Sequence, residues 1–157
     1  MKRCALSLCA MLLLSILSFS VTATDFTGTW IRDVAKSDSM ATNIGGKVTP
    51  VSADLIVKHS GTNLQVESRW DYQAPTKLTY ILDGNENRTT GYLGSTVIYR
   101  SSWDQDRLII DEVVNASTPF GKAEVETKYE WSMSDGGNTL TITAFTNGSS
   151  RKQIYHR

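Results

Sequence analysis

Glu112 is the residue whose type and position point most directly to chemistry. It follows Leu108 and Ile110 at the two-residue spacing of one face of a strand. A carboxylate on an apolar face is costly to bury alone, and we expect Arg32, Arg100 or a ligand amine beside it. The alternative is a bulge that shifts the register and turns Glu112 to solvent. A buried Glu112 would mark a binding site or, paired with a tyrosine, an acid–base site.

Further polar and aromatic residues lie at two-residue intervals from apolar residues, and so on the same face of their expected strands. A sealed core is more often aliphatic, whereas a barrel that holds a small ligand has an apolar wall with a few placed polar groups. The alternative is a filled interior in which hydroxyl groups bond neighbouring strands. We expect the ligand-binding residues to be Trp70, Tyr80, Tyr99, Glu112, Thr127 and Tyr129.

Metal and haem sites find little support in the sequence. His59 and His156 stand far apart, without the spacing of a metal-binding motif. A histidine near the end of the chain could bind haem, but a solvated side chain is the simpler interpretation. Asp104 and Asp106 supply too few oxygens for calcium and fit a turn better. We expect no metal and no cofactor.

Catalytic motifs are equally scarce. No Gly-x-Ser-x-Gly segment is present. A pair of carboxylates meeting across a barrel stays open as an alternative, although Glu124, Glu126 and Glu130 lie on a polar face. We therefore expect no catalytic residues.

The first 23 residues are typical of a secretory signal peptide. Lys2 and Arg3 precede an apolar run at 12–17, and small residues lead to Ala23. The run is too short for a comfortable membrane span. We expect cleavage after Ala23, one domain at 24–157, and a secreted or periplasmic location without a stable membrane span.

Cleavage would change the composition that the whole chain shows. The 16 basic and 16 acidic residues become 14 and 16, because the leader holds Lys2, Arg3 and no carboxylate. Cys4 and Cys9 both leave with it, so disulfides and thiol chemistry are excluded from the remaining domain. Near-neutral charge without a basic run argues against nucleic acid as a partner.

The remaining sequence predicts strands throughout. At 139–144 Leu, Ile and Ala alternate with threonine, and other segments alternate similarly between short turns such as Asp83-Gly84-Asn85. The stretch 35–50 fits a loop or a short 3₁₀ turn. Expected strands are 26–34, 51–59, 63–70, 76–82, 87–92, 95–103, 107–114, 122–133, 139–146 and 151–156. Sequential hairpins predict an all-β, antiparallel up-and-down barrel of about 8–10 strands, since closure removes exposed edges.

The segment 25–30, with Phe26, Gly28 and Trp30 at two-residue intervals, resembles the first strand of lipocalin and fatty-acid-binding (calycin) barrels. Together with two tryptophan-containing hairpins, it is similar to small secreted bacterial lipocalin-like proteins. The resemblance implies that Gly28 permits close strand approach and that Trp30 plugs the closed end. It also implies an arginine from the last strand stacked on that tryptophan, for which Arg151 and Arg157 are the candidates and Arg151 is preferred.

These observations predict an exported, non-enzymatic, lipocalin-like barrel that binds a small apolar or amphipathic molecule in its interior. The alternative is a periplasmic or extracellular protein-interaction or inhibitor module with a filled barrel. In that case function would lie in the loops at 35–50 or 115–121.

Overall fold

The computed structural model describes residues 24–39, 41–44, 47–50, 53–71, 73–91, 94–118 and 121–157. The expected signal peptide, residues 1–23, lies outside the described residues. The described chain is mostly β-strand, with almost no helix beyond a short 3₁₀ turn, η2, at Asp135–Gly137. The all-β expectation is therefore confirmed.

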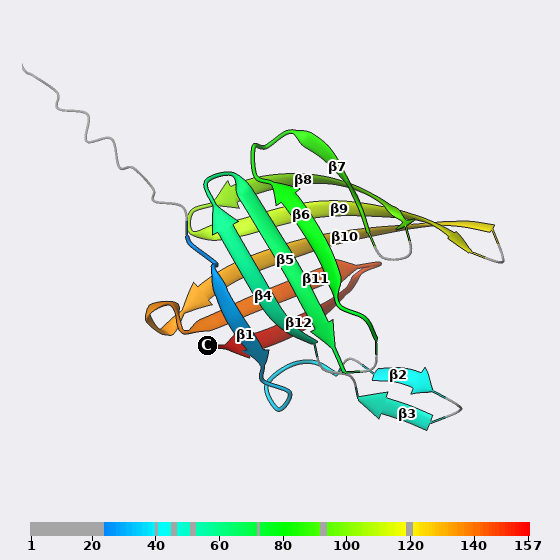
Figure 1. The fold of residues 1–157 in the computed structure, drawn as a ribbon, viewed down its shortest axis with the longest axis horizontal. Coiled ribbons are helices and arrows are strands. Elements are labelled where there is room, and N and C mark those ends of the chain that lie inside the picture. Colours follow the sequence, from blue (N-terminus) through cyan, green and yellow to red (C-terminus); the bar gives the residue numbers. More distant parts are fainter. Residues whose placement is uncertain are drawn as a thin grey trace, which may run out of the picture.

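Ten antiparallel strands form a single sheet that curls into a nearly closed barrel (Figure 1). Their order in the sheet is β6-β5-β4-β1-β12-β11-β10-β9-β8-β7. Successive barrel strands therefore pair with each other except β6 and β7, and β1 joins β4 to β12. The bounds are β1 Gly28–Arg32, β4 Ala53–Ser60, β5 Asn63–Trp70, β6 Thr76–Ile81, β7 Glu86–Thr90, β8 Thr96–Asp104, β9 Arg107–Thr118, β10 Gly121–Ser134, β11 Thr139–Thr146 and β12 Ser149–His156.

The strands follow the alternation seen in the sequence. In β4 the buried residues are Ala53, Leu55 and Val57, and the residues between them are more exposed. The turn Asn147-Gly148 has positive φ at both positions, as a tight two-residue hairpin turn requires, and it joins β11 to β12. These local signals explain why all ten expected strands are found in the barrel.

The barrel closes through side chains where β6 and β7 meet. No strand pairing joins these two among the described residues, so the sheet has a seam there. The Tyr99 hydroxyl of β8 accepts a hydrogen bond from the Ile81 backbone N–H at 2.8 Å, and the Ser101 hydroxyl donates to the Ile81 carbonyl at 3.4 Å. Side chains thus satisfy backbone groups that an edge strand would leave unpaired.

The stretch 35–50 differs from the expected loop or 3₁₀ turn. It contains a small hairpin, β2 at Ala41–Ile44 paired with β3 at Lys47–Pro50, which Figure 1 shows beside the end of the barrel. Gly45-Gly46 stands between the two strands in the sequence, and this dipeptide favours two-residue hairpin turns. The sequence expectation missed it because the strands have only four residues each and few apolar side chains.

Phe26 and Trp30 fill one end of the barrel, and both are fully buried. The Trp30 indole Nε1 donates to the Phe26 carbonyl at 2.9 Å. A Cβ atom at Gly28 would lie 3.3 Å from that nitrogen, so glycine permits this close approach. The structure differs from the expectation for the stacked arginine: the guanidinium over Trp30 belongs to Arg157, 4.6 Å from the ring centre, whereas Arg151 faces the cavity described below.

Candidate ligand-binding cavity

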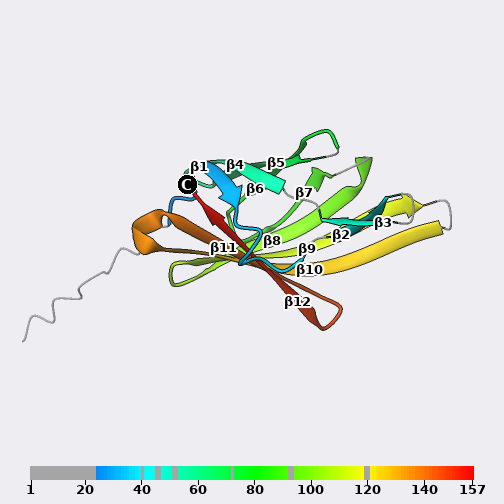
Figure 2. The same ribbon diagram turned by 90° about the horizontal axis from the view of Figure 1, so that it is seen from below.

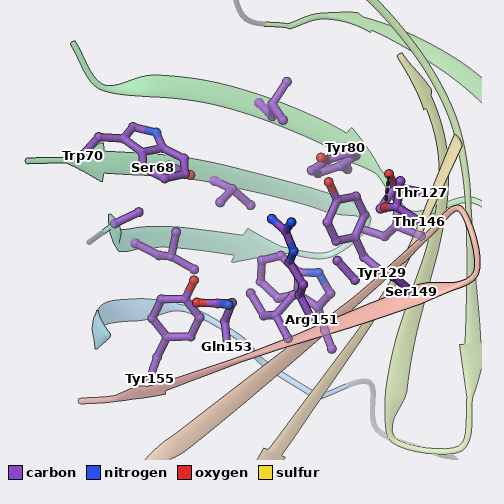
Figure 3. Close-up of a pocket in the computed structure, with 18 of the residues that line it drawn as sticks. Ser68, Trp70, Tyr80, Thr127, Tyr129, Thr146, Ser149, Arg151, Gln153 and Tyr155 are labelled. Atoms are coloured by element: carbon purple, nitrogen blue, oxygen red, sulfur yellow. Dashed lines mark hydrogen bonds between the residues drawn. The ribbon is translucent and has the colours of Figure 1, made fainter. Parts of the chain in front are cut away.

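A cavity of about 620 Å³ occupies the barrel interior away from Trp30 (Figure 3). Figure 2 shows β1, β4, β5 and β6 forming one wall, with β8 to β11 opposite. The lining is mostly apolar or aromatic, with several hydroxyl and amide groups. It consists of Ala53, Leu55, Val66, Ser68, Trp70, Leu78, Tyr80, Ile110, Thr127, Tyr129, Trp131, Ile142, Ala144, Thr146, Asn147, Ser149, Arg151, Gln153 and Tyr155.

Four of the six expected ligand-binding residues line this cavity. They are Trp70, Tyr80, Thr127 and Tyr129. The other two, Tyr99 and Glu112, line a second hollow of about 610 Å³ that also involves Thr127. The alternation of residues along each strand therefore predicted six residues that do line hollows of the barrel. The structure divides them between the main cavity and the second hollow. That any of them binds a ligand stays a prediction.

Glu112 is buried, with 6% of its surface exposed, and it reaches neither arginine that the sequence offered as a partner. The Tyr80 hydroxyl donates a 2.8 Å hydrogen bond to its Oε2 atom. Arg32 bonds Gln153 and the Asp38 carbonyl instead, and Arg100 lies opposite Asp111 in the β8–β9 pairing. Burial raises the pKa of Glu112, while the hydrogen bond from Tyr80 partly offsets that rise.

Two tyrosines lie near the Glu112 carboxylate, Tyr80 on β6 and Tyr129 on β10 of the opposite wall. Burial, followed by the charge of Glu112, raises the pKa of Tyr80 well above its ordinary value. The same two causes, burial first, raise the pKa of Tyr129 to about 12. Both phenols therefore stay protonated at neutral pH, so each has one hydroxyl proton to donate. Beside them, the hydroxyl groups of Thr127 and Thr146 lie 2.8 Å apart.

Tyr99 does not line the main cavity, and its contacts are with other parts of the barrel wall. Its ring meets that of Tyr80 edge-on, with centroids 4.9 Å apart. Its hydroxyl is engaged by the Ile81 N–H at the seam between β6 and β7. Tyr99 therefore supports Tyr80 and closes the barrel.

Strand β12 supplies cavity residues that were not among the expected ligand-binding set. Arg151, Gln153 and Tyr155 recur at two-residue spacing and all line the cavity (Figure 3). Arg151 is the one charged side chain among the described lining residues. The two-residue spacing could have revealed this face, but the resemblance assigned Arg151 to the closed end instead.

Gln153, the middle residue of this β12 row, is held by a buried polar network. Arg32, 5% exposed, donates to the side-chain oxygen of Gln153, and both side chains donate to the Asp38 carbonyl. Asp38 in turn accepts a hydrogen bond from the Lys152 backbone N–H. These bonds attach the segment after β1 to β12 and hold Gln153 in one orientation.

Neither a metal site nor a membrane-spanning helix is found within the described ranges. No group of three or more His, Cys, Asp and Glu side chains there could hold a metal ion. In the same part of the chain, no helix has the length and apolar character needed to cross a membrane.

Comparisons with solved structures show which fold the chain has. No family profile and no curated protein match the chain. Among solved structures, the REP1-NXSQ fatty acid transporter has a TM-score of 0.59 at 15% identity, covering 86% of this chain and 97% of that one. Fatty-acid-binding protein 1 of Echinococcus granulosus has a TM-score of 0.57 at 17% identity, with 84% and 96% covered.

A third similar structure has a name of a different kind. Secretory abundant heat soluble protein 4 from Ramazzottius varieornatus has a TM-score of 0.60 at 17% identity, with 87% of this chain and 96% of that chain covered. Identities this low are evidence of shared architecture only. The order of the strands, the seam and these likenesses together show that the chain has the fold of the calycin β-barrels.

Proposed function

We propose that the protein binds one small apolar or amphipathic molecule inside the barrel and performs no catalysis on it. The observation that carries this proposal is the cavity of about 620 Å³, within the range usual for small-molecule sites. Its mixed lining of aromatic walls and a few polar groups suits an amphipathic molecule. The similar structures named as a fatty acid transporter and a fatty-acid-binding protein support the same class of ligand.

The apolar part of the cavity would supply most of the affinity. Trp70, Trp131 and Leu78 are among the side chains that a hydrocarbon chain would contact there. Each methylene group removed from water contributes about 0.8 kcal/mol. Arg151 would interact with a polar or anionic group of the ligand, because it brings guanidinium donors to the cavity wall.

We further propose that the protein is exported and that ligand binding, not protein interaction, is its function. The signal-like segment 1–23 supports export to a secreted or periplasmic location. The interaction alternative requires a filled barrel, and the cavity favours ligand binding over it.

The direct test is titration with N-phenyl-1-naphthylamine, an uncharged probe that fluoresces in apolar surroundings. We expect saturable binding with one site per chain. Ala144→Phe places a ring in the cavity and should weaken binding at least about tenfold, or about 1.4 kcal/mol. Thr143→Phe is the matched control, because the neighbouring residue on β11 points to the opposite face.

Two results would contradict the proposal. One is the absence of saturable binding by the folded wild-type protein. The other is equal weakening by Ala144→Phe and Thr143→Phe, which would locate the probe outside the barrel.

A further inference from the structure

Tyr80 lines the cavity and is hydrogen-bonded to the buried Glu112, a polar pair that apolar binding alone does not require. We propose that Glu112 fixes the hydrogen-bonding direction of the Tyr80 hydroxyl, so that this end of the cavity selects a ligand carrying a hydrogen-bond donor, such as an alcohol. The inference rests on the proposed function and names the chemical class of ligand for the same cavity. Tyr80 would contact the ligand, and Glu112 would act as a positioning residue.

The hydrogen bond between Tyr80 and Glu112 has a fixed direction. An ionised carboxylate can only accept, so the 2.8 Å contact between the Tyr80 hydroxyl and Glu112 Oε2 uses the single proton of that hydroxyl. Tyr80 lines the main cavity, whereas Glu112 does not. A ligand in the cavity therefore meets a Tyr80 oxygen that has lone pairs to offer and no proton to give.

The carboxylate charge of Glu112 lies behind the Tyr80 oxygen. Arg100 and Lys128 border the hollow that Glu112 lines, but among the described residues no salt bridge involves Glu112. Its charge contributes to the raised pKa values of the neighbouring Tyr80 and Tyr129 phenols. An uncompensated buried carboxylate polarises the hydroxyl bonded to it and makes its oxygen a better acceptor. A donor group of the ligand would extend this chain of hydrogen bonds toward the charge.

The Tyr80 side chain is held rigidly by its neighbours. Tyr80 is 5% exposed, and its ring packs edge-on against Tyr99, which is itself bound to the Ile81 backbone. The Tyr80 hydroxyl therefore has little freedom to turn toward a different partner. An ether or ester oxygen, which can only accept, would face another acceptor here and lose a hydrogen bond that water would have provided.

The test compares two uncharged ligands of equal length, 1-decanol and methyl nonyl ether, as competitors of N-phenyl-1-naphthylamine at pH 7. The oxygens of both ligands can accept a hydrogen bond from Arg151, so this residue should not distinguish the two. We expect the wild-type protein to bind the alcohol about tenfold more tightly than the ether, beyond any difference in their partition between water and octane. Tyr80→Phe should reduce this preference to near unity, and Glu112→Gln should reduce it several-fold.

Ser68→Ala is the matched control, because it removes another hydroxyl from the cavity wall and should leave the preference unchanged. Probe affinity confirms that each variant is folded and open. Equal binding of alcohol and ether by a wild-type protein that binds the probe would overturn this inference and leave the proposed function standing. A preference unchanged in Tyr80→Phe would overturn it too, whereas a wild-type protein that binds no probe would overturn the proposed function itself.

Discussion

Arg157 holds its guanidinium 4.6 Å from the centre of the Trp30 ring and donates a 3.0 Å hydrogen bond to the Thr27 carbonyl. One side chain therefore attaches the end of β12 both to the plug of the barrel and to the residue that precedes β1. We expect Arg157→Leu to lower the free energy of unfolding by about 1–2 kcal/mol, as loss of a cation–π contact and a hydrogen bond implies. Arg151→Leu is the comparison in urea denaturation and should change stability less.

Phe26 should be the most costly residue to truncate at the closed end. It is fully buried and contacts Trp131 edge-on at 5.6 Å and Trp103 in a stacked arrangement at 6.1 Å. Phe26→Ala should destabilise the protein by about 3–5 kcal/mol. Phe145→Ala, at a residue 39% exposed, should cost far less in the same denaturation experiment, and similar costs would contradict this account.

Tyr99→Phe tests the closure of the seam. The substitution keeps the ring that packs on Tyr80 but removes the hydroxyl oxygen that accepts the Ile81 N–H. We expect a loss of about 1 kcal/mol and faster hydrogen exchange at the Ile81 amide. Amide exchange followed by NMR would show this, and unchanged protection at Ile81 would mean that the seam closes by other contacts.

Glu112→Gln should raise stability at neutral pH and have less effect in acid. Because burial raises the pKa of Glu112 in the folded protein, the folded chain holds that proton more tightly than the unfolded chain. The resulting stabilisation is complete below the unfolded pKa and is lost as pH rises through the folded value.

Other carboxyls act in the opposite sense. Hydrogen bonds lower the pKa of Asp25 and Asp83, so total stability still falls in acid. The quantity to measure is therefore the difference between wild type and Glu112→Gln in thermal unfolding from pH 4 to pH 8. A difference that stays constant across this range would contradict a buried, ionising Glu112.

Arg151→Leu should change ligand preference according to ligand charge. The guanidinium lines the cavity without an opposing charge among the other described lining residues. We expect the variant to bind decanoate several-fold more weakly while binding 1-decanol almost unchanged, because a charged hydrogen bond is stronger than a neutral one. Equal effects on both ligands would place their polar groups away from Arg151.

Sequence reasoning predicted the fold well because its evidence is local. The alternation along β11 and the turn at Asn147-Gly148 require no knowledge of distant strands, so the ten strands and their meandering order follow from them. The hairpin formed by β2 and β3 was missed because its strands are short and weakly apolar.

The candidate site was predicted in part, since it depends on contacts between distant strands. The alternation along β9 indicated that Glu112 is buried, and the structure agrees. The alternation does not reveal that Glu112 bonds Tyr80 of β6 and lines the second hollow instead of the main cavity. Likewise, Arg151 and Arg157 are an even number of residues apart, so the alternation along β12 assigns both to the same face. Only the pairing of Ile31 with His156 determines which one reaches Trp30.

The pairing of β1 with β12 also determines when the protein can fold. A ribosome delivers β1 more than a hundred residues before its partner, so the growing chain holds an unpaired strand edge until β12 emerges. Loop-closure entropy makes such a distant contact slow to form. The barrel should therefore reach its native state only after synthesis of β12, and chains truncated before that strand should aggregate or bind chaperones rather than bind ligand.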